Sequence, residues 1–277
     1  MRRLTTVCTL TALLAAGSAE VEAQNAQPVP LTLVATQAER VISGRSTDII
    51  GVHLGMTFEQ VSALVGRDVG GKPFLDNNLF SPQISRDGVV VATVPFRAYV
   101  EWRKGQEEGV KLFMGAPTTG NRAVIFWHGI AFPDEKTQQP PDYYQKVLTE
   151  KYGEPSGVEV VNQPAKVVKL YWAFDGNKQI KCPATGSCSI GVTVNSIAFT
   201  ASGTSFAEQD IKAGVHFVIR AVISTREYPN KTEALEVNMV DNDAVLETVT
   251  TAAKQLTDAM NAQLQQRGPV QPQAPRL

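Results

Sequence analysis

Histidine, cysteine and surplus charge are all scarce in this chain of 277 residues. It has three histidines and three cysteines, and no histidine has a second ligand residue at metal-binding spacing, so the sequence indicates no metal and no cofactor. The 26 basic residues balance 27 acidic ones, which leaves no basic excess to favour nucleic acid as a partner. No apolar run reaches the roughly 20 residues of a membrane-spanning helix, so we expect no transmembrane segment.

An export pattern opens the chain. Two arginines are followed by an uncharged stretch to residue 16 and then by small residues up to Ala23. This order is typical of a cleaved secretory signal peptide, so residues 1–23 predict a bacterial Sec-type signal and a periplasmic or secreted protein. Cleavage after Ala19 and cleavage after Ala23 both fit the small-residue rule. Cys8 lies inside the apolar run, not behind the small residues, so we expect no acylation.

The composition divides the remaining chain into three parts. Residues 24–30 are polar with two prolines and predict a flexible leader, and residues 268–277 form a Pro/Gln-rich stretch that predicts a disordered tail. Residues 31–267 predict the folded domain, with a candidate subdivision near residue 135. An apolar content of 43% is ordinary for a globular protein, so we expect the mature protein to be soluble.

Two cysteines remain after the predicted signal. Cys182 and Cys188 flank the turn-forming stretch PATGS, and nearby thiols usually pair in an oxidising compartment. A redox-active pair would have two residues between the cysteines. We therefore expect a structural disulfide that closes a short loop and stabilises the fold by about 2 kcal/mol.

One predicted helix covers residues 58–65. Thr57 and Gln60 have the spacing of a capping box, and apolar residues recur at helical spacing behind them. Gly66 is predicted to end this helix in a left-handed conformation.

Two further helices are predicted at 143–152 and 244–266. Asp142 and Asp243 stand at their N-cap positions, and Gly153 is expected to end the first of them. The second is the longest predicted element, with apolar residues recurring over its whole length.

Short apolar or alternating runs between the helices predict strands. They lie at 89–94, 96–103, 110–114, 122–132, 167–174, 190–200, 215–224 and 234–240. The run at 122–132 is apolar on both faces and predicts an interior strand. Because helices do not alternate regularly with strands, the expected class is α+β: antiparallel sheets with short packed helices and a long C-terminal helix. The helices after Thr57 and Asp142 are each followed by strands, which indicates two tandem helix-plus-sheet units.

Two short segments resemble exported bacterial proteins. Residues 51–61 (GVHLGMTFEQV) are similar to the helix start of β-lactamase-inhibitor-like domains and of the small lipoprotein of the outer-membrane barrel-assembly machine. Residues 151–155 (KYGEP) resemble a helix end found in periplasmic proteins. The resemblance implies short helices on antiparallel sheets and the binding of other proteins or of the cell envelope. The chain departs from the lipoprotein in lacking an acylated cysteine and in being much longer.

Residues that could carry chemistry are dispersed in the sequence. The three histidines stand in separate predicted strands: His53, His128 and His216. An acid–base or metal site would need two of them to converge in space. The segment GTSFA around Ser205 departs from the nucleophile-elbow motif at its last position. Asp134 and Glu135 are adjacent in a predicted loop, where both carboxylates are usually solvated. The sequence therefore indicates no catalytic residue.

The aromatic residues are the remaining candidates for binding. Trp102, Trp127 and Trp172 fall in predicted strands, and most of the aromatic residues are expected in the core, whereas a few exposed together would form a binding patch. Tyr143 is the candidate for an exposed binding residue, because Tyr144 takes the apolar face of the same helix. These observations predict an exported, soluble, non-enzymatic protein that binds another protein or a cell-envelope component. The alternative is an envelope hydrolase whose site is assembled from distant residues.

Overall fold

The computed structural model describes residues 27–35, 47–70, 73, 79–161, 166–182, 188, 201–225 and 231–267. The predicted signal peptide at 1–23, the expected strand at 190–200 and the predicted tail at 268–277 lie outside these residues. The described elements are helices and mainly antiparallel strands, which confirms the α+β class. Residues 29 and 30, which we expected in the flexible leader, belong to a short strand.

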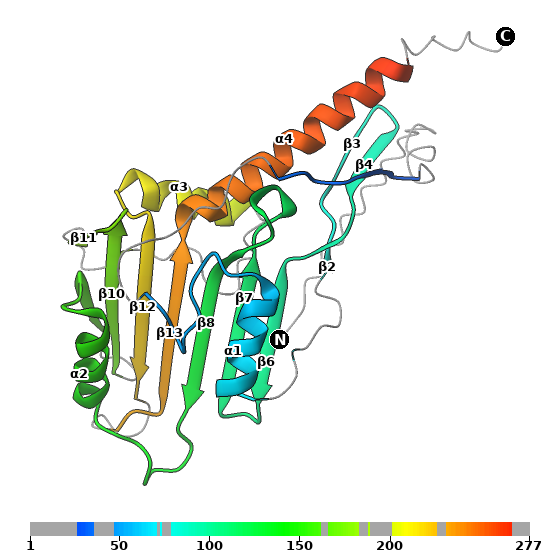
Figure 1. The fold of residues 1–277 in the computed structure, drawn as a ribbon. Coiled ribbons are helices and arrows are strands. Elements are labelled where there is room, and N and C mark those ends of the chain that lie inside the picture. The colour runs from blue at the N-terminus through cyan, green and yellow to red at the C-terminus, as the bar shows by residue number, and fades with distance from the viewer. Residues whose placement is uncertain are drawn as a thin grey trace, which may run out of the picture.

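A sheet of eight strands forms the centre of the molecule (Figure 1). Its order is β11-β10-β12-β13-β8-β7-β6, with β9 paired to β10, and all neighbouring strands are antiparallel. The strands are β6 (Tyr99–Lys104), β7 (Glu108–Met114), β8 (Ala123–Ala131), β9 (Gly157–Val161), β10 (Val167–Asp175), β11 (Lys178–Ile180), β12 (Phe217–Ser224) and β13 (Ala234–Asp241). The predicted interior strand corresponds to β8, which lies between β13 and β7.

The sheet is built from two units that follow one another in the chain. In the first unit, α1 (Phe58–Asp68) precedes the neighbouring strands β6, β7 and β8. In the second, α2 (Pro141–Tyr152) precedes the neighbouring strands β10, β12 and β13. The last strands of the two units, β8 and β13, pair with each other. The predicted tandem of helix-plus-sheet units therefore takes the form of one continuous sheet, and position 135 falls in the connection between the units.

A buried tryptophan in the first long strand of each unit packs against the helix of that unit. Trp102 in β6 stacks on Phe58 of α1 with 6.2 Å between ring centroids. Trp172 in β10 lies 5.2 Å from the ring of Tyr152 in α2. Both indoles are fully buried. Since large aromatic side chains dominate the energetics of burial, these contacts hold both helices against the same face of the sheet.

The start of α1 follows the sequence prediction, but its end does not. The Thr57 hydroxyl accepts a hydrogen bond from the Gln60 backbone, and the Gln60 side chain accepts one from the Thr57 backbone, so the capping box is confirmed. The helix continues through Gly66 to Asp68. Gly70, with φ of +79°, is the first left-handed residue after it. The prediction of Gly66 as the stop was wrong, because a second glycine follows four residues later.

The predicted caps of the other two long helices are each displaced by two residues. Asp142 lies inside the first turn of α2, because the helix begins at Pro141 after Pro140. In α4 (Asn242–Arg267), the Asp241 carboxylate accepts a hydrogen bond of 2.9 Å from the Ala244 backbone. The capping carboxylate is therefore Asp241 and not Asp243. In both cases an acidic residue within the first turn imitates a cap in the sequence pattern.

The two faces of the sheet are covered unequally. α1 and α2 cover one face, where the largest core cluster lies. On the second face, α3 (Ala201–Lys212) and the first turns of α4 pack where β8 begins and β13 ends, around Ile125 and Val240. No described helix covers the remainder of this second face.

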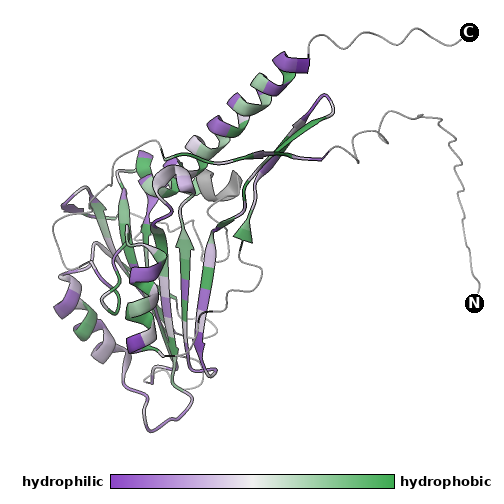
Figure 2. Cartoon of the chain, turned by 45° about the vertical axis from the view of Figure 1, so that its right-hand side comes forward, coloured by the Kyte–Doolittle hydropathy of each residue, from purple (hydrophilic) through white to green (hydrophobic). Residues whose placement is uncertain are grey.

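The second half of α4 projects beyond the large sheet (Figure 1). It packs against a small sheet of β1 (Val29–Leu31), β4 (Val89–Thr93) and β3 (Gln83–Arg86), with Val89 and Val91 against Leu256 and Met260. Figure 2 shows hydrophobic and hydrophilic residues alternating along this half of α4, as expected of a helix with one packed side. The short strands β2 (Leu79–Phe80) and β5 (Phe96–Arg97) and the turn η2 (Pro117–Thr119) complete the described elements. None of the described helices is long and apolar enough to cross a membrane.

Candidate functional site

The three histidines do not converge. His53 is exposed, His128 lies 2.8 Å from Glu108 at the α1 and α2 face of the sheet, and His216 lies 2.9 Å from Asp243 at the end of the sheet near α4. In the described part of the chain, neither paired imidazole hydrogen-bonds to a serine, threonine or cysteine side chain. The described residues also contain no group of three or more histidine, cysteine or acidic side chains that could hold a metal.

The other candidates from the sequence are Ser205, Asp134 and Glu135, and their surroundings are not those of catalytic residues. Ser205 is inside α3, so the segment around it is not the strand-to-helix turn that a nucleophile elbow requires. Asp134 accepts a hydrogen bond of 2.9 Å from the Lys136 backbone. Glu135 forms an ion pair with Lys231. These two carboxylates are exposed, so neither is the desolvated acid of an acid–base pair.

Cys182 and Cys188 are paired as a disulfide, with their Cα atoms 5.0 Å apart. The Cys188 side chain is buried in the cluster that α3 and α4 form with the sheet. The Cys182 backbone donates a hydrogen bond of 3.0 Å to the carbonyl of Ser156. Tyr143, the candidate binding residue, is 51% exposed on α2. It is therefore remote from the second face of the sheet, and its role in binding stays a prediction.

The part of the second face that no described helix covers carries two rows of side chains, and we call it the open face. The first row contains Glu101, Lys111, Trp127, Asn238, Arg220 and Tyr171, each opposite the next in register. The second row contains Arg103, Gly109, Gly129, Glu236, Val222 and Lys169. Both units contribute strands to these rows, so the open face exists only in the assembled sheet.

Trp127 lies at the centre of the open face, and its indole ring lies over two glycines. A Cβ atom at Gly129 would collide with the indole ring, and a Cβ at Gly109 would lie 3.4 Å from it. The indole Nε1 donates a hydrogen bond of 3.2 Å to Glu236. Trp127 is half-buried, whereas the other two tryptophans are fully buried. The glycines and the carboxylate thus fix the ring in one orientation while leaving part of it accessible.

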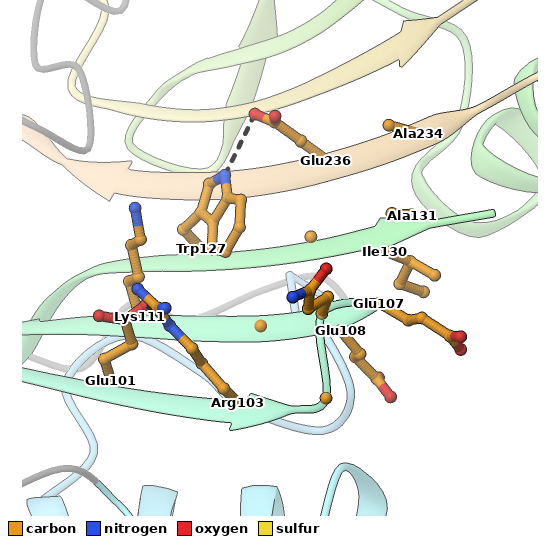
Figure 3. A pocket seen from close by; sticks show the side chains of 14 residues that line it. Glu101, Arg103, Glu107, Glu108, Lys111, Trp127, Ile130, Ala131, Ala234 and Glu236 are labelled. Atoms are coloured by element: carbon orange, nitrogen blue, oxygen red, sulfur yellow. Dashed lines mark hydrogen bonds and ion pairs between the residues drawn. The ribbon is translucent and has the colours of Figure 1, made fainter. Parts of the chain in front are cut away.

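A cavity of about 460 Å³ lies beside Trp127, between β6 and β13 (Figure 3). Its lining includes four glutamates and two basic residues: Glu101, Glu107, Glu108, Glu236, Arg103 and Lys111. Lys111 lies at one end with its amine 4.9 Å from the centroid of the Trp127 ring. Figure 3 shows Glu107, Ile130, Ala131 and Ala234 toward the other end. The cavity therefore combines one aromatic surface, a short apolar wall and more acidic than basic side chains.

A network of hydrogen bonds holds the charged rim of this cavity in the first unit. Glu101 lies 2.6 Å from Arg103 and accepts a hydrogen bond of 3.1 Å from the Tyr99 hydroxyl. Burial raises the pKa of the Tyr99 hydroxyl well above its usual range, and the adjacent Glu101 carboxylate adds to this effect. The tyrosine therefore stays a proton donor, and its hydrogen bond and the ion pair with Arg103 orient the carboxylate of Glu101.

The second unit repeats this arrangement at the opposite side of the open face. Glu159 in β9 pairs with Lys169 at 3.0 Å and accepts a hydrogen bond of 3.0 Å from Tyr171. The hydrogen bond from Lys169 lowers the pKa of Glu159, and burial raises that of Tyr171. Between the two networks, Asn238 is 1% exposed, and neither of its amide atoms has a hydrogen-bond partner.

Sequence reasoning missed this site because it expected most aromatic residues in the core and selected Tyr143, not Trp127, as the exposed one. The available signal was the pair of strand glycines, since a glycine inside a strand often marks the close approach of another group. Gly109 and Gly129 are opposite each other in register, which only the strand pairing reveals.

Comparison with protein-family models, curated proteins and solved structures finds no match to this chain. The fold and the site by themselves define a two-unit α+β protein with a sheet face that the described helices cover only in part.

Proposed function

We propose that this chain is an exported, non-enzymatic module that binds another protein through the open face. One observation carries the proposal: Trp127 is held rigidly on Gly129 beside a charged cavity, on a sheet face that no described helix covers. A fixed aromatic ring surrounded by polar groups is the usual composition of a binding hot spot. Water over the accessible part of this ring would be released on contact with a partner.

The breadth of the face supports a protein partner. The two rows of side chains cross six strands, and neighbouring strands lie about 4.8 Å apart. Charged groups are distributed along the rows, with Glu101 and Arg103 on one side and Glu159 and Lys169 on the other. Such separated charges favour an extended complementary surface, because charge complementarity steers and orients a protein partner.

Export is supported by two features of different kinds. The sequence at 1–23 has the order of a secretory signal, and Cys182 and Cys188 are paired, as is common in oxidising compartments. The resemblance of residues 51–61 to β-lactamase-inhibitor-like domains also favours a protein-binding role in the cell envelope.

The experiment is a comparison of three forms of the mature protein as bait for envelope proteins. We expect wild-type protein and the variant Tyr143→Ala to retain the same partner and Trp127→Ala to lose it. Thermal melting of each bait establishes that it is folded. If Trp127→Ala captures the partner as well as wild type, the open face is not the binding surface. If instead only Tyr143→Ala loses it, the binding surface is on α2.

A further inference from the structure

We infer that the cavity beside Trp127 binds an arginine side chain of the partner polypeptide, stacked on the indole and paired with Glu236. This inference rests on the proposed function and specifies the chemistry of the same site. It follows from the charges of the cavity, from the orientation of the ring and from the unused polar groups next to it.

The cavity contains negative charge that no described residue neutralises with an ion pair. Glu101 is paired with Arg103, and Glu108 hydrogen-bonds to His128. The carboxylate of Glu236 accepts its hydrogen bond from the neutral indole of Trp127. Neither Glu236 nor Glu107 has an ion-pair partner among the described residues. A cation entering the cavity would therefore find two carboxylates that are available for pairing.

The ring of Trp127 offers the second contact. The amine of Lys111 lies 4.9 Å from its centroid, so a cation can approach a face of this ring. Lys111 makes this contact without an ion pair to Glu236. A guanidinium can make both contacts at once, because it is planar, stacks on aromatic faces and donates two parallel hydrogen bonds to a carboxylate. Arginine therefore fits the site better than lysine does.

An independent observation concerns Asn238, which lies directly opposite Trp127 in register and two residues beyond Glu236 on the same face. It is 1% exposed, and neither its amide oxygen nor its amide nitrogen has a hydrogen-bond partner. A buried unpaired amide costs free energy, and Asn238 is not among the residues that line the cavity. Its amide is therefore an unused polar group next to Trp127, and the guanidinium, with five N–H donors, keeps donors after pairing with Glu236.

The dimensions and the wall of the cavity suit the remainder of the side chain. Its volume of about 460 Å³ is within the range of ligand-binding clefts. Ile130, Ala131 and Ala234 form an apolar part of the lining, against which the methylene groups of an arginine can pack.

The test uses N-acetyl-arginine amide as the probe and N-acetyl-citrulline amide as its neutral isostere. The readout is the indole N–H signal of each tryptophan in the two-dimensional NMR spectrum of the mature protein. We expect a saturable shift of the Trp127 signal with the arginine probe alone. The signals of Trp102 and Trp172 serve as internal controls, since both side chains are fully buried.

Two variants have opposite expected effects. Glu236→Gln should weaken binding of the arginine probe at least tenfold, because it removes the paired charge. Lys111→Met should strengthen it severalfold, because it removes a competing cation. Glu150→Gln on the exposed side of α2 is the matched control and should leave the affinity unchanged.

Each other outcome contradicts the inference. Equal binding of the citrulline probe would show that the site does not recognise charge, and weaker binding to Lys111→Met would show that Lys111 does not compete with the arginine for the ring. If the arginine probe gives no saturable shift while Trp127→Ala still abolishes partner capture, this inference fails and the proposed function stands. If partner capture is also independent of Trp127, both fail.

Discussion

Gly129 and Trp127 are two residues apart on the same face of β8, and the indole of Trp127 occupies the space that a side chain at position 129 would fill. The absence of a Cβ at Gly129 is therefore what allows the ring to lie along the sheet and to reach Glu236. The orientation of the candidate binding residue depends on this glycine.

Replacing Gly129 with alanine should displace the ring. We expect Gly129→Ala to destabilise the protein by about 1–3 kcal/mol, as overpacking usually does, and to break the hydrogen bond between Trp127 and Glu236. Urea denaturation measures the first effect, and the indole N–H signal of Trp127 reports the second. An unchanged indole signal in a folded variant would contradict the role assigned to Gly129.

Replacing Gly66 with alanine should stabilise the protein, in contrast to the same change at Gly129. Gly66 lies inside α1, and a Cβ there would meet nothing within 4 Å. Gly66→Ala should therefore stabilise the protein by about 0.5–1 kcal/mol. Gly70→Ala should destabilise it, since the φ of Gly70 is +79° and side chains strain that conformation. Urea denaturation of both variants would reveal the true end of α1, and the reverse order of stabilities would place it at Gly66.

Thr57 caps α1 on the face of the sheet opposite the candidate site. Thr57→Ala should lower the free energy of unfolding by about 0.5–2 kcal/mol and leave partner binding intact. Thermal melting and partner capture are measured on the same preparation. Unchanged melting with lost binding would mean that this segment is a contact surface rather than a helix start.

Asp210 should make stability depend on pH. It is buried between α3 and α4, 5% exposed, with the Asn242 amide 3.4 Å from its carboxylate, and burial raises its pKa to about 7. Since an unfolded aspartate has a pKa of about 3.9, the folded state binds this proton more tightly. Its stabilising contribution is complete below about pH 4 and is lost as the pH rises to about 7, at up to about 1.4 kcal/mol per pH unit.

The variant Asp210→Asn isolates this effect. An asparagine at 210 can still accept a hydrogen bond from Asn242 but does not ionise. The unfolding free energies of wild type and variant are measured in urea from pH 4 to 8. The stability of the wild type relative to the variant should fall as the pH rises over this range. A constant difference over this range would show that Asp210 does not titrate there.

The disulfide closes a loop of few residues, so its removal should have a modest effect. We expect Cys182→Ser with Cys188→Ser to destabilise the protein by about 2 kcal/mol and to retain the fold. Thermal melting of the variant, and of wild type with and without reductant, measures this. Titration of unreduced, unfolded protein should find no free thiol at these two positions.

Local sequence patterns were sufficient for the elements themselves. The spacing of Thr57 and Gln60 predicted the start of α1, because a capping box depends only on residues within one turn. The pairing of Cys182 with Cys188 was predictable from six positions of separation for the same reason. The cap of α4 was misplaced because two neighbouring acidic residues, Asp241 and Asp243, compete for one hydrogen-bonding position. The start of α2 was misplaced because the helix begins at Pro141, with Asp142 already inside its first turn.

The α+β class, the tandem helix-plus-sheet order and the long C-terminal helix were determined by the sequence alone, since periodicity and capping are local. The tertiary structure decided that β8 and β13 pair, and hence that the two units share one sheet. Only that pairing brings Glu236 beside Trp127 and places Asn238 opposite it. No local rule specifies which strands meet, because the free energy of strand pairing comes from contacts between residues that are distant in the chain.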